Sequence, residues 1–467
     1  MMGAVLVTIS PTKPTRPTSA RELEELDRRH LIHPLLPGGS SERCVVVRGT
    51  GCTVWDADDN QLLDVAGGGN WLSHVGHGRQ EIARAMADQA SALGYFTSFA
   101  EFSNDKSVQL ARRLVELAPE GFDRVFFTCG GSEGVDTAVK AARTYHHRRG
   151  EPDRTWIIGR NMGYHGSSYG SGTITGFDLM DEAIGPNLPH VEKVSPPFPF
   201  HPEMYGGKDV TDFLVDELER TVERLGPGNV AAMIGEPVMA GGGVVAPPPD
   251  YWPRVRQLLN RHGILLIADE VVTAFGRTGA WFDSVGRGMD PDLIVTAKGL
   301  TSGYAPLGAV LISHGIGEVL ISGEGFVHGF TYFGHPVSCA AALANLDLIE
   351  GENLLDRARL IADWFREGLA PAEGLEAVGQ IRVEGAMVGI ELVADRGTRA
   401  PLPPAAAAAA VAEIHRKHGV ITRFYGPVIV MAPPLVIEED QVARASEAVV
   451  EVLSRLGTDG TLSPSTE

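Results

Sequence analysis

The chain has 467 residues, 43% of them apolar and 21% charged, which is the composition of a folded protein with a large core. A formal net charge of −19 excludes the basic face that nucleic-acid binding requires, so the expected partners are small molecules. The cysteines are few and lack metal-ligand spacing, so we expect free thiols in a reducing compartment and no metal site. No apolar window reaches the ~18 residues of a membrane span, and residues 4–9 lack the basic flank of a signal peptide. These features predict a cytoplasmic protein.

The N-terminal part of the chain predicts a tail followed by a small meander. Residues 1–20 are rich in Pro, Thr and Ser and are expected to be disordered, and residues 21–30 predict a helix. Three short strands joined by turn sequences follow at 44–47, 53–56 and 61–65. The glycine run 66–71 lacks a strand–loop–helix fingerprint, so we interpret it as flexible backbone beside a site.

Two helices are predicted next, over residues 80–93 and 107–117. Between them lies YFTSFAEFSN, whose polar residues indicate exposure although the segment is rich in aromatic side chains. Such a loop is usually a site of local packing, but it also suits the rim of a substrate pocket.

Residues 124–142 predict an anion site. A strand at 124–128 leads through the glycine-rich turn CGGSEG into an amphipathic helix, whose free N–H groups and dipole point at the turn. Gly130, Gly131 and Ser132 would surround a phosphate, with the Ser132 hydroxyl as a further donor. The alternative is an ordinary strand-to-helix turn.

Three charged residues follow predicted buried strands. The apolar runs 230–234, 264–268 and 293–297 end shortly before Glu236, Asp269 and Lys298 respectively. Ligands of open parallel sheets bind at the carboxyl ends of the strands, so these side chains should face one site. Pyridoxal phosphate (PLP) needs a lysine amine for its Schiff base and an acid that keeps its pyridine nitrogen protonated. By itself the acid–lysine pair could equally be a buried salt bridge.

Tyr164 lies in a glycine-flanked loop after a predicted strand at 155–159. Its ring could stack on a flat cofactor or serve a structural purpose. Residues 176–209 carry many prolines and little periodicity, which predicts a long surface excursion.

The chain beyond residue 350 has less regular alternation and begins a further unit. Residues 405–418 predict a helix, because Pro403 and Pro404 precede it and Gly419 follows it. A strand at 420–422 ends on Arg423, in a loop-like sequence that would let the arginine swing toward solvent. The expected organisation is a disordered tail (1–20), an N-terminal segment of a small domain (21–75), a large domain (76–350), a C-terminal small domain (351–456) and a disordered tail (457–467).

Taken together, these motifs resemble the class III, or omega-type, aminotransferases of PLP fold type I over about residues 21–456. The resemblance rests on CGGSEGVDTAVKAAR, GYHGS, GEPV, ADEV…FGRTG, AKGL, GFTYFGHP and APPL, which occur in this order. It implies an α/β fold with a mostly parallel central sheet flanked by helices. A smaller α+β domain would be built from the N- and C-terminal segments.

The resemblance also implies roles for individual residues. Lys298 would form the Schiff base with PLP, and Asp269 would pair with the pyridine nitrogen. Val271 and Tyr164 would contact the two faces of the cofactor ring, and Glu236 would lie beside the ring. Gly131 and Ser132 would bind the phosphate. Thr331 would reach the phosphate from the second subunit of a homodimer or tetramer. One departure is Gly134, where the family has Ala or Ser, so we expect a more pliable phosphate loop.

The chain is most similar to the subgroup that uses amines or omega-amino acids with pyruvate. The substrate residues implied are Leu35, Trp71, Phe99, Tyr164 and Arg423. Arg423 would bind the substrate carboxylate, and Phe99 would line the neighbour's pocket. Leu35 and Ala100 replace bulkier aromatics, which predicts a roomier pocket.

The expected reaction is ping-pong transfer of an amino group from an amine or omega-amino acid to a keto acid, with pyruvate as the expected acceptor. Three alternatives remain open. They are a 2-oxoglutarate-dependent enzyme of the 4-aminobutyrate type, a PLP-dependent racemase or decarboxylase of the same fold, and a non-catalytic PLP-binding homologue.

Overall fold

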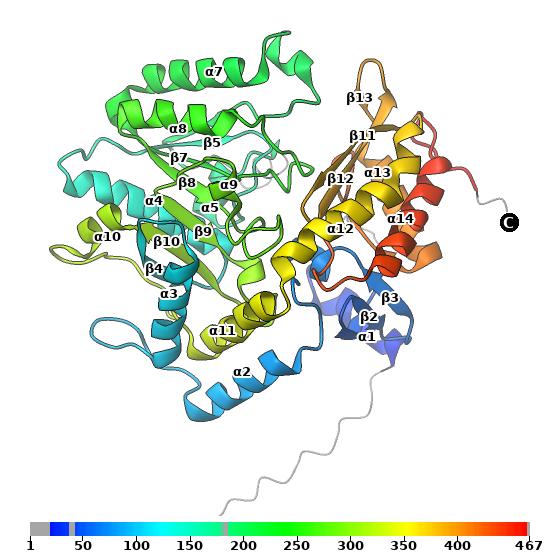
Figure 1. The fold of residues 1–467 in the computed structure, drawn as a ribbon, viewed down its shortest axis with the longest axis horizontal. Helices are drawn as coiled ribbons and strands as arrows, with labels where there is room; N and C mark the ends of the chain where they lie inside the picture. Colours follow the sequence, from blue (N-terminus) through cyan, green and yellow to red (C-terminus); the bar gives the residue numbers. More distant parts are fainter. Residues whose placement is uncertain (1–18, 37–42, 179, 181–184, 465–467) are drawn as a thin grey trace, which may run out of the picture.

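A computed structural model describes residues 19–36, 43–178, 180 and 185–464. Of the predicted N-terminal tail, only Ser19 and Ala20 are among them, and they open helix α1. The chain forms a large and a small part that lie side by side, and helix α12 (Leu354–Leu369) starts near the boundary and runs across the small part (Figure 1). No helix among the described residues has the length and apolar character needed to cross a bilayer.

The large part is built on a seven-stranded sheet of order β4-β10-β9-β8-β7-β5-β6, in which only β10 runs antiparallel to its neighbours. Its strands are β4 (Phe122–Thr128), β5 (Trp156–Arg160), β6 (Val191–Val194), β7 (Val230–Gly235), β8 (Leu265–Asp269), β9 (Leu293–Thr296) and β10 (Gly308–Ser313). The central strands are buried on both faces, which is why they are continuous apolar runs in the sequence.

Helices cover both faces of this sheet. They are α2 (Gln80–Ala92), α3 (Asp105–Leu117), α4 (Gly131–Arg148), α5 (Tyr169–Ile174), α7 (Val210–Leu225), α8 (Tyr251–His262), α9 (Asp283–Gly286), α10 (His314–Ile321) and α11 (Pro336–Gly351). Successive side chains of a strand point to opposite faces of the sheet and so enter two different cores. Ile157 and Ile267 pack with α4 on one face, whereas Ile158 and Leu266 pack with α7 and α8 on the other face.

The small part joins segments from both ends of the chain. Its helices are α1 (Ala20–His30), α12, α13 (Pro404–His418) and α14 (Glu439–Ser454). One sheet has the order β1-β2-β3-β14 and the other β11-β12-β16-β15, with β13 paired to β12. The strands are β1 (Val46–Thr50), β2 (Thr53–Asp56), β3 (Gln61–Asp64), β11 (Val378–Glu384), β12 (Met387–Asp395), β13 (Ala400–Pro401), β14 (Val420–Ile421), β15 (Arg423–Tyr425) and β16 (Val428–Met431). Because β3 pairs in parallel with β14, the N- and C-terminal segments form one unit, as predicted.

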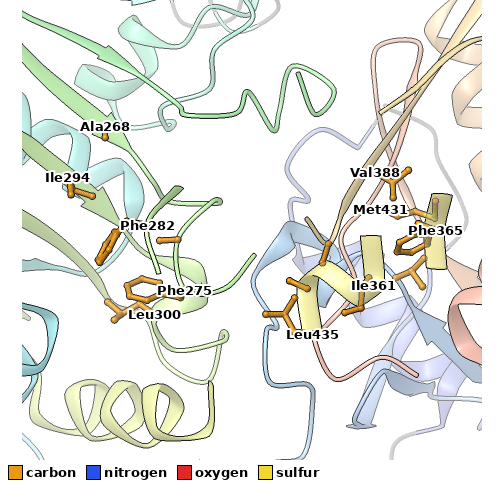
Figure 2. Close-up of a cluster of buried hydrophobic side chains, with 14 of the residues drawn as sticks. Ala268, Phe275, Phe282, Ile294, Leu300, Ile361, Phe365, Val388, Met431 and Leu435 are labelled. Carbon is orange, nitrogen blue, oxygen red and sulfur yellow. The ribbon is translucent and has the colours of Figure 1, made fainter. Parts of the chain in front are cut away.

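One hydrophobic core connects the two parts. Phe275 and Leu300 lie in it on the large side, and Ile361, Phe365 and Leu435 lie in it on the small side (Figure 2). The site-bearing strands are therefore anchored in the same packed interior as the small part.

Three sequence expectations differ from the structure. Residues 176–209 contain edge strand β6 and the buried Phe198 and Tyr205, so much of this segment belongs to the body of the protein. Residues 457–464, expected in the disordered tail, form a turn closed by a bridge between Leu456 and Leu462. Arg423 does not follow its strand but opens a further one, β15, opposite Val430.

Candidate active site

The carboxyl ends of three adjacent parallel strands bring together Glu236, Asp269 and Lys298. Gly235 of β7 lies opposite Ala268 of β8, and Asp269 lies opposite Val295 of β9. Glu236 directly follows β7, and Lys298 opens the 3₁₀ turn Lys298–Leu300, separated from the end of β9 only by Ala297. The predicted convergence of these side chains is therefore present.

Asp269 is buried and is held by two hydrogen bonds. One carboxylate oxygen accepts from the Val271 backbone N–H at 3.1 Å, and the other lies 2.7 Å from His165 Nδ1. The His165 side chain is fully buried, and its backbone N–H donates to Thr175 Oγ1 at 2.9 Å. This histidine fixes the direction of the carboxylate, a role that the sequence analysis did not assign although it quoted the motif GYHGS.

Glu236 links two loops beneath the site. One oxygen accepts from the Tyr164 backbone N–H and the other from the Ala240 N–H, both at 3.1 Å. Burial raises the pKa of this carboxyl, and nearby Asp269 adds to the effect while His165 opposes it. Glu236 thus holds the Tyr164 loop against the end of β7.

Lys298 has a lowered pKa. Burial is the main cause and Arg277 adds to it, while Asp269 and Glu236 act in the opposite direction. The residue has a φ of 41°, in the left-handed region that non-glycine residues rarely adopt. A lysine amine that loses its proton more readily is suited to nucleophilic and proton-transfer chemistry.

The N-terminus of α4 has the unpaired N–H groups that the predicted anion site requires. Gly134 is the first residue of this turn whose N–H is paired, to the Gly130 carbonyl at 3.0 Å, and the N–H groups before it have no intrahelical partner. Ser132 Oγ accepts from the Ser167 N–H at 3.1 Å, which places the Tyr164 loop beside the anion site. A side chain at Gly131 would lie 3.0 Å from Val271, so Val271 spans the space between this helix end and Asp269.

Gly134 does not loosen the phosphate loop as expected. It lies inside α4, where a side chain would come within 2.7 Å of Val295. The glycine instead allows the helix to approach β9 closely.

Tyr164 and Trp71 lie on the small-domain side of the site. The Tyr164 hydroxyl is 3.0 Å from Ser167 Oγ, and its ring is partly exposed. Trp71 is buried against the loop that follows β7 and against β16, with its ring 6.2 Å from that of Tyr425. Arg423 acts electrostatically on Tyr425, whose pKa is raised mainly by burial, so the arginine lies near the same edge.

Arg423 is exposed. No described residue forms a hydrogen bond or an ion pair with its guanidinium. No acid in the described part of the chain therefore holds this arginine in place.

Thr331, Phe99 and Leu35 occupy exposed positions. The Thr331 carbonyl accepts from the Tyr95 hydroxyl at 2.7 Å, and Phe99 packs beside Gly329. Around them lies an exposed aromatic surface, in which the Tyr95 ring contacts Tyr332 and the Phe96 ring contacts Phe102. Leu35 is 80% exposed near the N-terminal helix, so its place in a pocket stays a prediction.

Comparison with known proteins identifies the family. The model of the class III aminotransferases matches residues 37–453. The chain belongs to this family. It is 36% identical over 405 residues to the putrescine–pyruvate aminotransferase of Pseudomonas aeruginosa, covering 85% of this chain and 88% of the relative. It is 34% identical over 445 residues to the diaminobutyrate–2-oxoglutarate transaminase of Halomonas elongata, covering 91% and 94%.

A solved structure supports the same assignment. An amine transaminase from an uncultivated Pseudomonas species, in its PLP-bound internal aldimine form, superposes with a TM-score of 0.87 at 38% identity, covering 90% of this chain and 97% of the other. The chain is thus a class III aminotransferase that uses PLP and has the predicted fold. Its residues fit this cofactor: the α4 N-terminus and Ser132 suit a phosphate, Val271 offers an apolar face for the ring, and Asp269 is a buried, oriented acid.

Proposed function

We propose that the enzyme is an omega-transaminase that moves an amino group from an amine or omega-amino acid to a keto acid, with pyruvate as the preferred acceptor. The observation that supports it most is the juxtaposition of Lys298, Asp269 and Glu236 beside the α4 N-terminus. The similarity to an aminotransferase named for putrescine and pyruvate favours this substrate pair.

When bound, PLP supplies an electron sink that stabilises negative charge on the substrate carbon. Lys298 would bind the cofactor covalently and, once released, would carry a proton from the donor carbon. Its lowered pKa makes the neutral amine more abundant near neutral pH. Asp269 would keep the pyridine nitrogen protonated, because His165 and the Val271 N–H hold its carboxylate in one direction.

The ring and the phosphate would be held by residues on three elements. Val271 and Tyr164 would contact the two faces of the ring, and Glu236 positions the Tyr164 loop. Gly131 and Ser132 would donate to the phosphate from the first turn of α4.

Arg423 would bind the substrate carboxylate. A guanidinium without a partner in the described part of the chain is available for a charge-assisted contact with a keto acid, and its exposure lets it remain in water when an uncharged amine occupies the pocket. Trp71 and Leu35 would line that pocket.

We further propose a homodimer with shared active sites in the cytoplasm. Thr331 and Phe99 lie on an exposed aromatic surface, which is the type of surface that subunit contacts cover, so they would complete the partner's site. All four cysteines are free thiols, which suits a reducing compartment.

A 2-oxoglutarate-dependent activity is the second candidate, favoured by the similarity to a diaminobutyrate–2-oxoglutarate transaminase. Racemase or decarboxylase activity is the third, because it would use the same lysine. A donor screen with pyruvate and with 2-oxoglutarate separates the first two. Adding donor without keto acid should bleach the yellow absorbance of the bound cofactor if half of a transamination occurs, whereas a racemase would keep it.

The central test is Lys298→Ala. Turnover and the yellow absorbance of covalently held cofactor should both disappear, while apoenzyme circular dichroism stays that of the wild type. Arg256→Ala, at an ion pair with Asp292 near the opposite ends of the strands, is a control that should remain yellow. A yellow Lys298→Ala protein after extensive dialysis would contradict the assignment.

A further inference from the structure

The turn that carries Lys298 is held between two buried side chains that come from distant parts of the sequence. The His74 ring lies where a side chain of Gly299 would be, and Asn345 of helix α11 donates to the Gly299 carbonyl. Neither residue belongs to the cofactor-binding set described above.

His74 packs its ring directly on Gly299. A β-carbon at Gly299 would lie 2.5 Å from Nδ1 and 2.9 Å from Nε2 of the imidazole, so a side chain there would overlap the ring. His74 Nδ1 is 3.0 Å from the Phe275 carbonyl, and the backbone N–H of His74 donates to Ser302 Oγ at 3.2 Å. The ring is therefore fixed from both the Asp269-bearing and the Lys298-bearing segments.

The surroundings of His74 favour the neutral form of its ring. Its pKa lies well below the ordinary value, mainly because it is completely buried and additionally because Arg277 and Lys298 place positive charge nearby. A neutral ring can pack against the lysine turn without adding a further positive charge to the site.

Asn345 binds the backbone carbonyl groups of the turn. Its side-chain amide donates to the Gly299 carbonyl at 2.8 Å and to the Leu300 carbonyl at 3.0 Å, and the residue is fully buried. These bonds tie the turn to α11. Leu300 lies in the same core as Phe275, whose carbonyl His74 contacts (Figure 2).

The turn needs such support because its backbone is strained. Lys298 has a φ of 41° and Ser302 a φ of 50°, conformations that persist only when surrounding structure enforces them. We infer that His74 and Asn345 are positioning residues that hold the Lys298–Leu300 turn, His74 by packing on Gly299 and Asn345 by bonding to the carbonyls of the turn. Together they fix the place of the Lys298 amine relative to Asp269. This inference rests on the proposed function of Lys298.

The experiment uses changes that introduce no charge at the turn. Gly299→Ala pushes a methyl group onto the His74 ring, and its glycine does not have a left-handed φ, so any effect arises from this contact. The double variant Gly299→Ala/His74→Ala removes the ring and relieves the overlap, and His74→Ala alone completes the double-mutant cycle. Asn345→Leu removes both donors at similar volume, and Asp347→Leu on the exposed face of the same helix is its control.

The readouts are the pH midpoint of the cofactor's yellow absorbance, kcat and KM for the donor, and the thermal midpoint of the apoenzyme. Gly299→Ala and Asn345→Leu should shift the absorbance midpoint and lower kcat about 10–100-fold with little change in KM, because a displaced lysine is poorly aligned in every bound complex. The double variant should recover part of both losses. Asp347→Leu should match the wild type.

The charged groups that act on the pKa of Lys298 are Asp269, Glu236 and Arg277, and none of them is changed in these variants. An unchanged midpoint and a kcat within twofold of wild type in Gly299→Ala would overturn the inference. A loss of kcat in the double variant that equals the combined losses of the two single variants would also overturn it. If Asn345→Leu does not fold, the Gly299–His74 cycle alone decides. A wild type without yellow absorbance, or a yellow Lys298→Ala, would instead refute the proposed function.

Discussion

At the scale of single residues, the site depends on how buried charges are held. Asp269 is tolerated at 4% exposure because each carboxylate oxygen has a donor. The sequence predicted Asp269 and Lys298 because each directly follows a buried apolar strand. It did not predict His165 as the partner of Asp269, since a histidine in a loop has no periodic signal and the two residues are 104 positions apart.

Asp269→Asn should slow transamination by about 10³-fold or more, which corresponds to about 4 kcal/mol of transition-state stabilisation. The amide keeps the shape of the carboxylate but cannot keep the pyridine nitrogen protonated. Stopped-flow measurement of the donor half-reaction tests this. Thr175→Val, which removes the side-chain bonds to the His165 N–H and to the Gly166 and Ser171 carbonyls but leaves Asp269 unchanged, is a control for disturbance of the loop. A rate within tenfold of wild type in Asp269→Asn would exclude the proposed role.

Arg423→Ala should weaken the half-reaction with a keto acid by roughly 2–4 kcal/mol and leave the half-reaction with an uncharged amine nearly unchanged. The reason is that only the keto acid presents a carboxylate to the guanidinium. Single-turnover kinetics on each half-reaction measure the two effects separately. Equal losses in both would mean that Arg423 has a structural function instead.

At the scale of elements, a buried polar cluster joins the small part to the loop beside the site. Glu391 of β12 lies 2.7 Å from His201 Nε2 and also pairs with Arg382 of β11. Arg382 Nε donates to the Gly243 carbonyl at 2.9 Å, in the loop that starts at Glu236. The position of that loop, and with it the packing of Trp71, is therefore coupled to the sheet of the small part.

The same cluster predicts a pH-dependent stability. Hydrogen bonding to Glu391, and secondarily to Glu203, raises the pKa of His201. Two positively charged side chains, Arg382 and Arg399, also lie near this histidine. A raised folded-state pKa stabilises the protein fully below the unfolded-state value of about 6.5, and the contribution is lost as the pH rises through the folded-state pKa.

His201→Asn should therefore lower apoenzyme stability by about 1 kcal/mol at low pH, because the charged hydrogen bonds are lost, and by less at high pH. Thermal unfolding at pH 6 and pH 9 checks this prediction. His147→Asn, at an exposed position on α4, is the control. A loss that is equal at both pH values, or larger at pH 9, would contradict it.

At the scale of the whole molecule, the sequence predicted the central sheet well and the periphery less well. The strands that bear the site are uninterrupted apolar runs, which only double-sided burial explains. Strand β6 was missed because its four residues, VEKV, include two charged side chains and lie at the sheet edge. Arg423 was assigned to a loop because a three-residue strand such as β15 has too few positions to show an alternating pattern.

The exposed aromatic surface around Phe99 and Thr331 predicts that active sites are completed across a subunit interface. Thr331→Asp would put a carboxylate where the partner's cofactor phosphate is expected, so this variant should be inactive, as should Lys298→Ala. In a mixed dimer, one site combines both defects and the other has an intact Lys298 and an intact Thr331. Mixing the two inactive proteins under conditions of subunit exchange should therefore restore activity at up to one site per heterodimer. Mixing Lys298→Ala with Asp269→Asn should restore none, because each site takes both of these residues from the same chain. Activity that stays absent in heterodimers verified by mass spectrometry, or full activity in a wild-type monomer, would show that each chain builds its site alone.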